Sequence, residues 1–252
     1  MNITPVVKQL LIINVLFFIG TMALGDFNPT NPAYRILAMY FFENPNFYFW
    51  QPITHMFMHG GLMHIAFNMF ALYSFGSALE HFWGGRKFIF FYISCGLGAA
   101  LMHTAVNYYF FEEGMHALMS QGFSETEISA VLNGKGNDQI VSLLNTPSFQ
   151  NFVSSYLGTV VGASGAIYGL LVAFAFMFPN AELALMFIPV PIKAKYFVPG
   201  ILVVDLYLGL SGGSIFGGST GVAHFAHIGG ALIGFLMMWY WKKNQFNKNR
   251  WN

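Results

Sequence analysis

Residues 162–178, GASGAIYGLLVAFAFMF, decide how this sequence is interpreted. The stretch carries no charged side chain, and a serine framed by two glycines, Ser164, stands near its beginning. A helix running from Ser164 to Phe178 would be only about 22 Å long, less than the roughly 30 Å hydrocarbon core of a bilayer. The pattern therefore predicts a serine below the membrane surface, reached by irregular backbone that lines a watery cavity. The alternative is that the small residues serve only close helix packing.

The composition of the 252-residue chain is that of a membrane protein. Hydrophobic residues make up 56% and charged residues 8%, with a mean hydropathy of +0.54. These values exclude an ordinary soluble domain. The net charge of +1 does not indicate a nucleic-acid partner, and we expect none. The single cysteine, Cys95, lies in an apolar run and is interpreted as a small core residue rather than a nucleophile.

Hydropathy predicts an all-α polytopic membrane protein, a bundle of six transmembrane helices in one domain covering residues 1–252. The first span has one lysine before a long apolar core and no convincing cleavage site, so we expect it to be retained rather than removed as a signal peptide. The predicted spans are 6–24, 62–79, 88–111, 156–178, 196–210 and 222–241.

The basic residues divide unequally between the two sides of the membrane. With the N-terminus in the cytoplasm, only Arg35 and Lys135 of the eleven lysines and arginines fall outside. The positive-inside rule then predicts that both termini are cytoplasmic. We expect a multi-pass protein of a bacterial inner (plasma) membrane. The nine basic residues on the inner side are Lys8, Arg86, Lys87, Lys193, Lys195, Lys242, Lys243, Lys248 and Arg250.

Two outer segments separate the predicted spans. The first outer loop, about residues 26–61, is rich in aromatic residues and is predicted to lie partly in the membrane interface, with an ordinary aromatic belt as the alternative. Asn31, before a proline, predicts a helix start in this loop. Residues 112–155 form a polar insert, in which the capping-box sequence of residues 124–127 predicts a short surface helix. We assign no chemistry to the insert.

A histidine and an asparagine share one face of the second predicted helix. His64 and Asn68 are four residues apart, and two glycines just before them indicate where the helix begins. An imidazole and a carboxamide on one face are suitable donors to a developing oxyanion. A polar pair bonding between helices is the alternative interpretation.

The last predicted helix offers a base. His227 is followed at i+3 and i+7 by Gly230 and Gly234, so all three share a face that lets this helix approach a partner closely. Tyr168, four residues after Ser164, is placed to stack on an incoming imidazole. Because no aspartate lies nearby in sequence to complete a triad, these residues predict a serine–histidine dyad. A histidine that only bridges two helices is the alternative.

Four ordered motifs carry a family resemblance. Residues 59–68, HGGLMHIAFN, fit H-x4-H-x3-N, and residues 76–84, GSALEHFWG, fit G-x3-E-x3-G. Residues 162–165, GASG, fit G-x-S-G, and residues 223–234, AHFAHIGGALIG, fit a histidine helix with G-x3-G. This set resembles the rhomboid intramembrane serine proteases, and the similarity extends over about residues 5–241.

The resemblance implies a rhomboid-like six-helix fold and a role for each matching residue. Ser164 would be the nucleophile and His227 the general base and then acid, while His64, Asn68 and the Ser164 backbone amide would form the oxyanion hole. Substrates would be membrane proteins cut in or near a transmembrane helix through an acyl-enzyme, with no metal and no cofactor. The supporting residues that it implies are Tyr168, Gly162, Gly165, Gly230, Gly234 and His59.

Two positions stand apart from the family pattern. The family's Trp-Arg in the first outer loop reads Trp50-Gln51 here, which puts the polar anchoring of that loop in question. Asp205 is alone in the fifth predicted span. We expect it to bond near the end of that helix and assign it no catalytic role.

Two other functions fit parts of the sequence. A catalytically inactive rhomboid-like protein that binds membrane clients would typically lack the serine or the histidine, and this chain keeps both. A histidine-rich membrane metalloprotein would draw ligands from His55, His59, His224 and His227. However, the sequence has no H-E-x-x-H motif, and no carboxylate accompanies these histidines in sequence. Sensitivity to chelators would discriminate between the metal site and the dyad.

Overall fold

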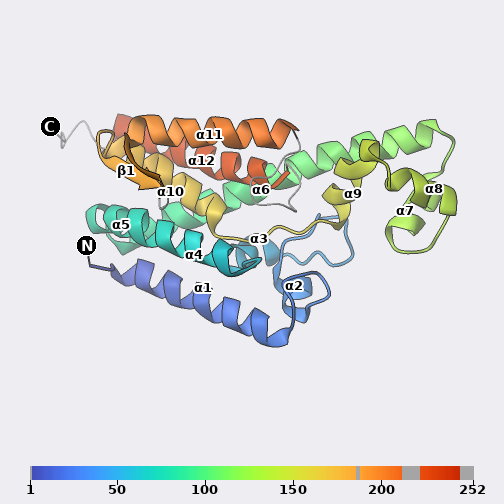
Figure 1. The fold of residues 1–252 in the computed structure, drawn as a ribbon, viewed down its shortest axis with the longest axis horizontal. Helices are drawn as coiled ribbons and strands as arrows, with labels where there is room; N and C mark the ends of the chain where they lie inside the picture. Colours follow the sequence, from blue (N-terminus) through green and yellow to red (C-terminus); the bar gives the residue numbers. More distant parts are fainter. Residues whose placement is uncertain (1, 186–187, 212–221, 245–252) are drawn as a thin grey trace.

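The computed structural model describes residues 2–185, 188–211 and 222–244, which form a helical bundle with a smaller helical cluster at one end (Figure 1). The helices of the bundle are α1 (Pro5–Leu24), α4 (Leu62–Ala71), a π-helical turn η2 (Leu72–Gly76), α5 (Ser77–Trp83), α6 (Gly85–Ser120), α10 (Ser164–Met177), α11 (Ala194–Ser211) and α12 (Val222–Asn244). The remaining elements are α2 (Pro32–Leu37), α3 (Gln51–Thr54), η1 (His55–Phe57), α7 (Glu125–Leu132), α8 (Asp138–Leu144), η3 (Pro147–Phe149), α9 (Gln150–Leu157), β1 (Glu182–Leu185) and β2 (Ile188–Lys193).

The helical polytopic fold predicted from hydropathy is confirmed. Within the described residues, four helical spans are long and apolar enough to cross a bilayer: α1, Leu62–Trp83, α6 and α11. α10 is apolar but has only 14 residues, and α12 packs beside it in the centre of the bundle. The count of six full crossings is therefore not matched helix for helix.

Two helix boundaries differ from those of the predicted spans. α6 continues to Ser120, nine residues past the end of the predicted span, because Phe111, Met115 and Leu118 pack against the helices of the insert. The predicted span 156–178 begins in the last two residues of α9, and extended backbone that pairs Met39 with Val160 separates them from α10. Hydropathy cannot detect such a break because the residues on both sides of it are apolar.

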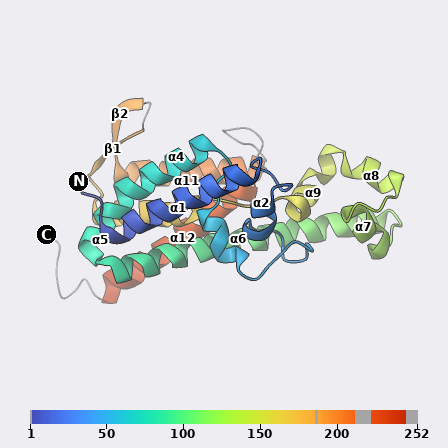
Figure 2. The same cartoon turned by 90° about the horizontal axis from the view of Figure 1, so that it is seen from below.

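The insert forms a small helical cluster of its own. The capping box at Ser124 is confirmed, with Ser124 and Glu127 bonding each other's backbone at the start of α7. Apolar residues of α7, α8 and α9 are buried against the end of α6. Ile128, Ile140 and Phe152 lie at the centre of this cluster. Figure 2 shows this cluster at the far end of α6, and the β1–β2 hairpin projecting from the opposite end.

Glycines set the spacing at the centre of the bundle. A methyl group added to Gly230 of α12 would lie 1.8 Å from the Gly165 carbonyl oxygen of α10, and one on Gly234 would lie 2.8 Å from the Cα of Gly169. The two backbones are therefore in direct contact, as the glycine face of the sequence predicts. This contact holds the start of α10 beside the part of α12 that follows His227.

The end of the bundle that carries the chain's N-terminus is closed by a buried carboxylate. Glu80 of α5 accepts hydrogen bonds from the Val6 and Val7 amides, both at 2.9 Å, and from the Thr4 hydroxyl at 2.5 Å. It thereby satisfies free N–H groups at the start of α1 and complements the helix dipole. This contact gives the glutamate of the G-x3-E-x3-G motif a structural role.

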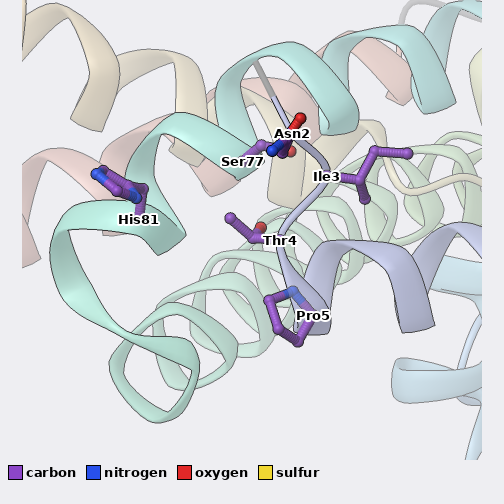
Figure 3. A pocket seen from close by; sticks show the side chains of 6 residues that line it. All are labelled: Asn2, Ile3, Thr4, Pro5, Ser77 and His81. Carbon is purple, nitrogen blue, oxygen red and sulfur yellow. The ribbon is translucent and has the colours of Figure 1, made fainter.

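A hollow of about 390 Å³ lies beside this contact (Figure 3). Thr4 and Pro5 line it from α1 and its approach, and Ser77 and His81 line it from α5. His81 lies 17 residues after His64 along one helical span, a separation of about 25 Å. The hollow is therefore distant from the predicted catalytic residues.

Candidate active site

Ser164 is the first residue of α10, which is 14 residues long. At about 1.5 Å per residue the helix spans about 21 Å, so a helix that ends at the inner boundary of the bilayer would leave Ser164 below the outer one. The backbone amides of the first helical turn have no partner within the helix. Because Ser164 is the first residue of α10, its amide is available to a group outside the helix.

His227 approaches Ser164 from α12. Its Nε2 atom lies 2.9 Å from the Ser164 Oγ, which is hydrogen-bonding distance. The Tyr168 ring stacks on the imidazole with a centroid distance of 4.3 Å and an interplanar angle of 11°. Ser164 and Tyr168 of α10 therefore meet His227 of α12 at one point. The hydroxyl–imidazole pair has the geometry of an activated serine nucleophile.

A carboxylate holds the other side of this imidazole. Asp205 of α11 is 5% exposed, and its Oδ1 lies 3.2 Å from His227 Nδ1. The same oxygen lies 2.5 Å from the Nδ1 of His224, one turn earlier on α12. Sequence reasoning assigned Asp205 only a bond near its helix end and so missed this contact. An ionisable residue inside a membrane span was the signal that pointed to it.

His64 and Gly162 lie beside Ser164. Gly162 has a φ of +127°, and a methyl group added there would lie 2.8 Å from His64 Nε2 and 3.5 Å from the Ser164 Oγ. The His64 ring is therefore close to the serine. Asn68 is buried one turn further along α4, where its Nδ2 donates to the His64 carbonyl oxygen at 3.0 Å. The structure brings His64 to the serine and shows Asn68 bonded to its own helix.

The first outer loop supports the segment that precedes Ser164. The Gly162 amide donates to the His55 carbonyl oxygen at 2.9 Å, and His55 Nδ1 lies 2.9 Å from the Gln51 carbonyl oxygen. Gln51 is fully buried, and its side chain bonds the Tyr40 amide and the Asn46 carbonyl oxygen. Gln51 therefore anchors the loop with polar contacts in place of the family's arginine.

Two more histidines of this loop are buried away from water. His59 stacks edge to face on His64, with a centroid distance of 5.1 Å. Burial lowers the pKa of His55 to about 4 and that of His59 to about 3. Both rings are therefore uncharged at neutral pH. They lie in the loop before α4, whereas His224 and His227 lie on α12, so the four histidines do not form one cluster.

Asp205, His224 and His227 are close enough to be considered as metal ligands, since their ligand atoms lie within 4.8 Å of one another. The two imidazole Nδ1 atoms lie 2.5 and 3.2 Å from one oxygen, Asp205 Oδ1. This is also the arrangement of two imidazole N–H groups that donate to one carboxylate.

The comparisons with known proteins point to one family. The Rhomboid domain family model matches residues 46–244. An uncharacterized mitochondrial rhomboid protein of Schizosaccharomyces pombe is 28% identical over 77% of this chain and 52% of its own length. The mitochondrial presenilin-associated rhomboid-like protein of Homo sapiens is 26% identical over 82% of this chain and 41% of its own. Rhomboid protease AarA of Providencia stuartii is 30% identical over 75% and 54%.

These matches extend over most of the bundle. The chain spans about half the length of the curated relatives it matches. The matched range contains every motif on which the resemblance rests, from His59 to Gly234. The chain therefore belongs to the rhomboid family.

Proposed function

We propose that this protein is an intramembrane serine endopeptidase, with Ser164 as the nucleophile and His227 as the general base. The observation that carries this proposal is the 2.9 Å contact between the Ser164 Oγ and His227 Nε2, made across two helices inside a membrane-length bundle. The relative named rhomboid protease supports it. A binding protein without activity would have no need to keep both residues in contact.

The proposed reaction follows from that contact. The Ser164 Oγ bonds to the carbonyl carbon of the substrate while its proton passes to His227 Nε2, and the carbonyl π electrons move to the oxygen. When the tetrahedral intermediate collapses, the C–N bond breaks and His227 gives the proton to the leaving amine. Water, deprotonated by His227, then attacks the acyl-enzyme, releasing the acid product and restoring the Ser164 hydroxyl.

The groups near Ser164 supply donors to the tetrahedral oxygen. The Ser164 amide is unpaired within its helix, and His64 lies beside Gly162. Asn68 has a second amide hydrogen besides the one that bonds its own helix. We assign these three groups to the oxyanion hole, with His59, Gly162, Gly165, Gly230, Gly234 and Tyr168 supporting the site. No metal or cofactor takes part in this proposal.

The depth of the serine indicates the class of substrate. Because Ser164 lies at the start of a short helix inside an apolar bundle, a scissile bond must reach it within or next to the bilayer. We propose that the substrates are membrane proteins cut in or near a transmembrane helix. The lipid bilayer is the second partner, and no nucleic-acid partner is proposed.

The protein is an integral membrane protein, and its orientation is proposed from charge. The start of α6, which carries Arg86 and Lys87, and the start of α1 lie at one end of the bundle, whereas α2 and α7 lie toward the other (Figure 1). We propose that the first end is cytoplasmic. Several relatives are mitochondrial, which conflicts with a bacterial inner membrane as the compartment, whereas AarA is from a bacterium.

Cleavage of single-span membrane substrates in detergent or vesicles tests the proposal. Ser164→Ala and His227→Ala should each abolish cleavage in a folded protein, and the double variant should be no worse than either, because the pair acts as a unit. Ser155→Ala, at a buried serine of α9, and His116→Ala, at an exposed histidine, are the matched controls and should cleave normally. Full cleavage by Ser164→Ala would overturn the proposal.

A further inference from the structure

We propose that Asp205 is a positioning residue for His227, and that His224 holds the Asp205 carboxylate in place. The active site would then be a chain of four residues, Ser164–His227–Asp205–His224, rather than a serine–histidine dyad. This inference rests on the proposed function, since it assigns a role within the same site. The residues come from three helices, and their contacts are continuous.

The tautomer of His227 determines whether it can act as the base. To receive the proton of Ser164, Nε2 must be unprotonated, so the ring hydrogen must be on Nδ1. Nδ1 lies 3.2 Å from Asp205 Oδ1, and an ionised carboxylate can only accept. The carboxylate therefore selects the tautomer in which Nε2 faces the serine. It also stabilises the imidazolium that forms when the serine loses its proton.

The Asp205 carboxylate is paired inside its membrane span. A carboxylate inside a membrane span is costly unless it is paired, and such residues serve function by default. Asp205 is 5% exposed, and two imidazole nitrogens lie within hydrogen-bonding distance of its Oδ1. Two donors to one oxygen favour the ionised form. Because His224 makes the shorter contact, at 2.5 Å, the carboxylate remains held when His227 moves with the transferred proton.

Besides the bond to Asp205, the His227 ring is held by stacking on Tyr168. Tyr168 stacks on its face and restrains the tilt of the ring. A stacking contact does not restrain rotation of the ring within its own plane and does not distinguish Nδ1 from Nε2. The bond to Asp205 does both. Packing and the carboxylate therefore have separate tasks in placing the base.

The test compares kinetics of the full-length protein in detergent. Asp205→Asn keeps the size of the side chain but lets the amide donate to His227, which favours the wrong tautomer. It should lower kcat by about 10²–10⁴-fold and leave KM nearly unchanged, as expected for loss of a triad carboxylate. Asp138→Asn, at an exposed position on α8, is the control and should have normal kcat.

A stability measurement separates positioning from a structural role. Asp205→Asn should lower kcat in a protein whose melting temperature is nearly unchanged, because Asp205 acts on His227 rather than on the packing of the bundle. A purely structural aspartate would instead lower the melting temperature and leave kcat per folded molecule nearly unchanged. That outcome would overturn the inference.

Two more results complete the test. If Asp205→Asn does not fold, His224→Leu still tests the chain of contacts, since leucine has no donor and the carboxylate is left in place; it should lower kcat by about 3–10-fold with KM unchanged. Full kcat in His224→Leu would then contradict the inference. Full kcat in a folded Asp205→Asn, alongside inactive Ser164→Ala, would overturn this inference while the proposed function stands. Activity in Ser164→Ala would overturn both.

Discussion

Two buried carboxylates, Glu80 at the end of the bundle that carries the N-terminus and Asp205 beside His227, have the same exposed fraction of 5% and different partners. Glu80 accepts from a hydroxyl and two backbone amides at the start of α1. Asp205 accepts from two imidazoles. Backbone amides do not titrate near neutral pH, whereas an imidazole gains and loses a proton there easily. The partner, rather than burial or charge, therefore indicates which carboxylate serves structure and which serves chemistry.

The largest expected effect on cleavage comes from the contact between α10 and α12, near Asp205 and Ser164 and far from Glu80. Gly230→Ala places a methyl group where the Gly165 carbonyl oxygen lies, so the helices must move apart. A displacement of about 1 Å between Ser164 and His227 should lower cleavage per folded molecule by about 10²-fold. Cleavage kinetics normalised to folded protein measure this effect.

Gly20→Ala is the matched control for that change. Gly20 lies within α1, and a methyl group there meets no heavy atom within 4 Å. The variant should cleave normally and be at least as stable, since alanine favours helix over glycine. Equal loss of activity in both variants would show that the bundle tolerates no added methyl group, and the special role of the α10–α12 contact would be wrong.

A smaller effect, on stability rather than on cleavage, is expected at Glu80. Glu80→Ala leaves the amides of Val6 and Val7 without their acceptor and should lower the free energy of unfolding by about 2–3 kcal/mol. Thr4→Val removes one of the three donors and should cost about 1 kcal/mol. Denaturation in detergent measures both. Cleavage per folded molecule should stay unchanged, and a large loss of kcat at unchanged stability would break the comparison.

Much of the site could be predicted because its residues follow local rules. The glycine spacing after His227 predicts a face that allows backbone contact, and the contacts of Gly230 and Gly234 confirm that face. α10 starts at Ser164, two residues after Gly162, whose φ of +127° suits glycine and disfavours other residues. Periodicity and turn chemistry are properties of neighbouring residues, so one sequence is sufficient to identify them.

What the sequence does not predict depends on contacts between distant segments. Asp205 precedes His227 by 22 residues and belongs to another helix, so no spacing rule connects them. The break between α9 and α10 is fixed by the pairing of Met39 with Val160 and by the loop around His55. The length of α6 depends on the insert that packs on its end. In each case packing decides the result, and packing is not local.

Covalent labelling with a fluorophosphonate probe tests the central claim most directly. The probe reacts only with an activated serine, and mass spectrometry of the labelled protein identifies the residue. We expect one modified residue, Ser164, and loss of labelling in His227→Ala, since the imidazole 2.9 Å from the Ser164 Oγ must take its proton. Labelling of another serine, or undiminished labelling of Ser164 in His227→Ala, would contradict the assignment of these two residues as nucleophile and base.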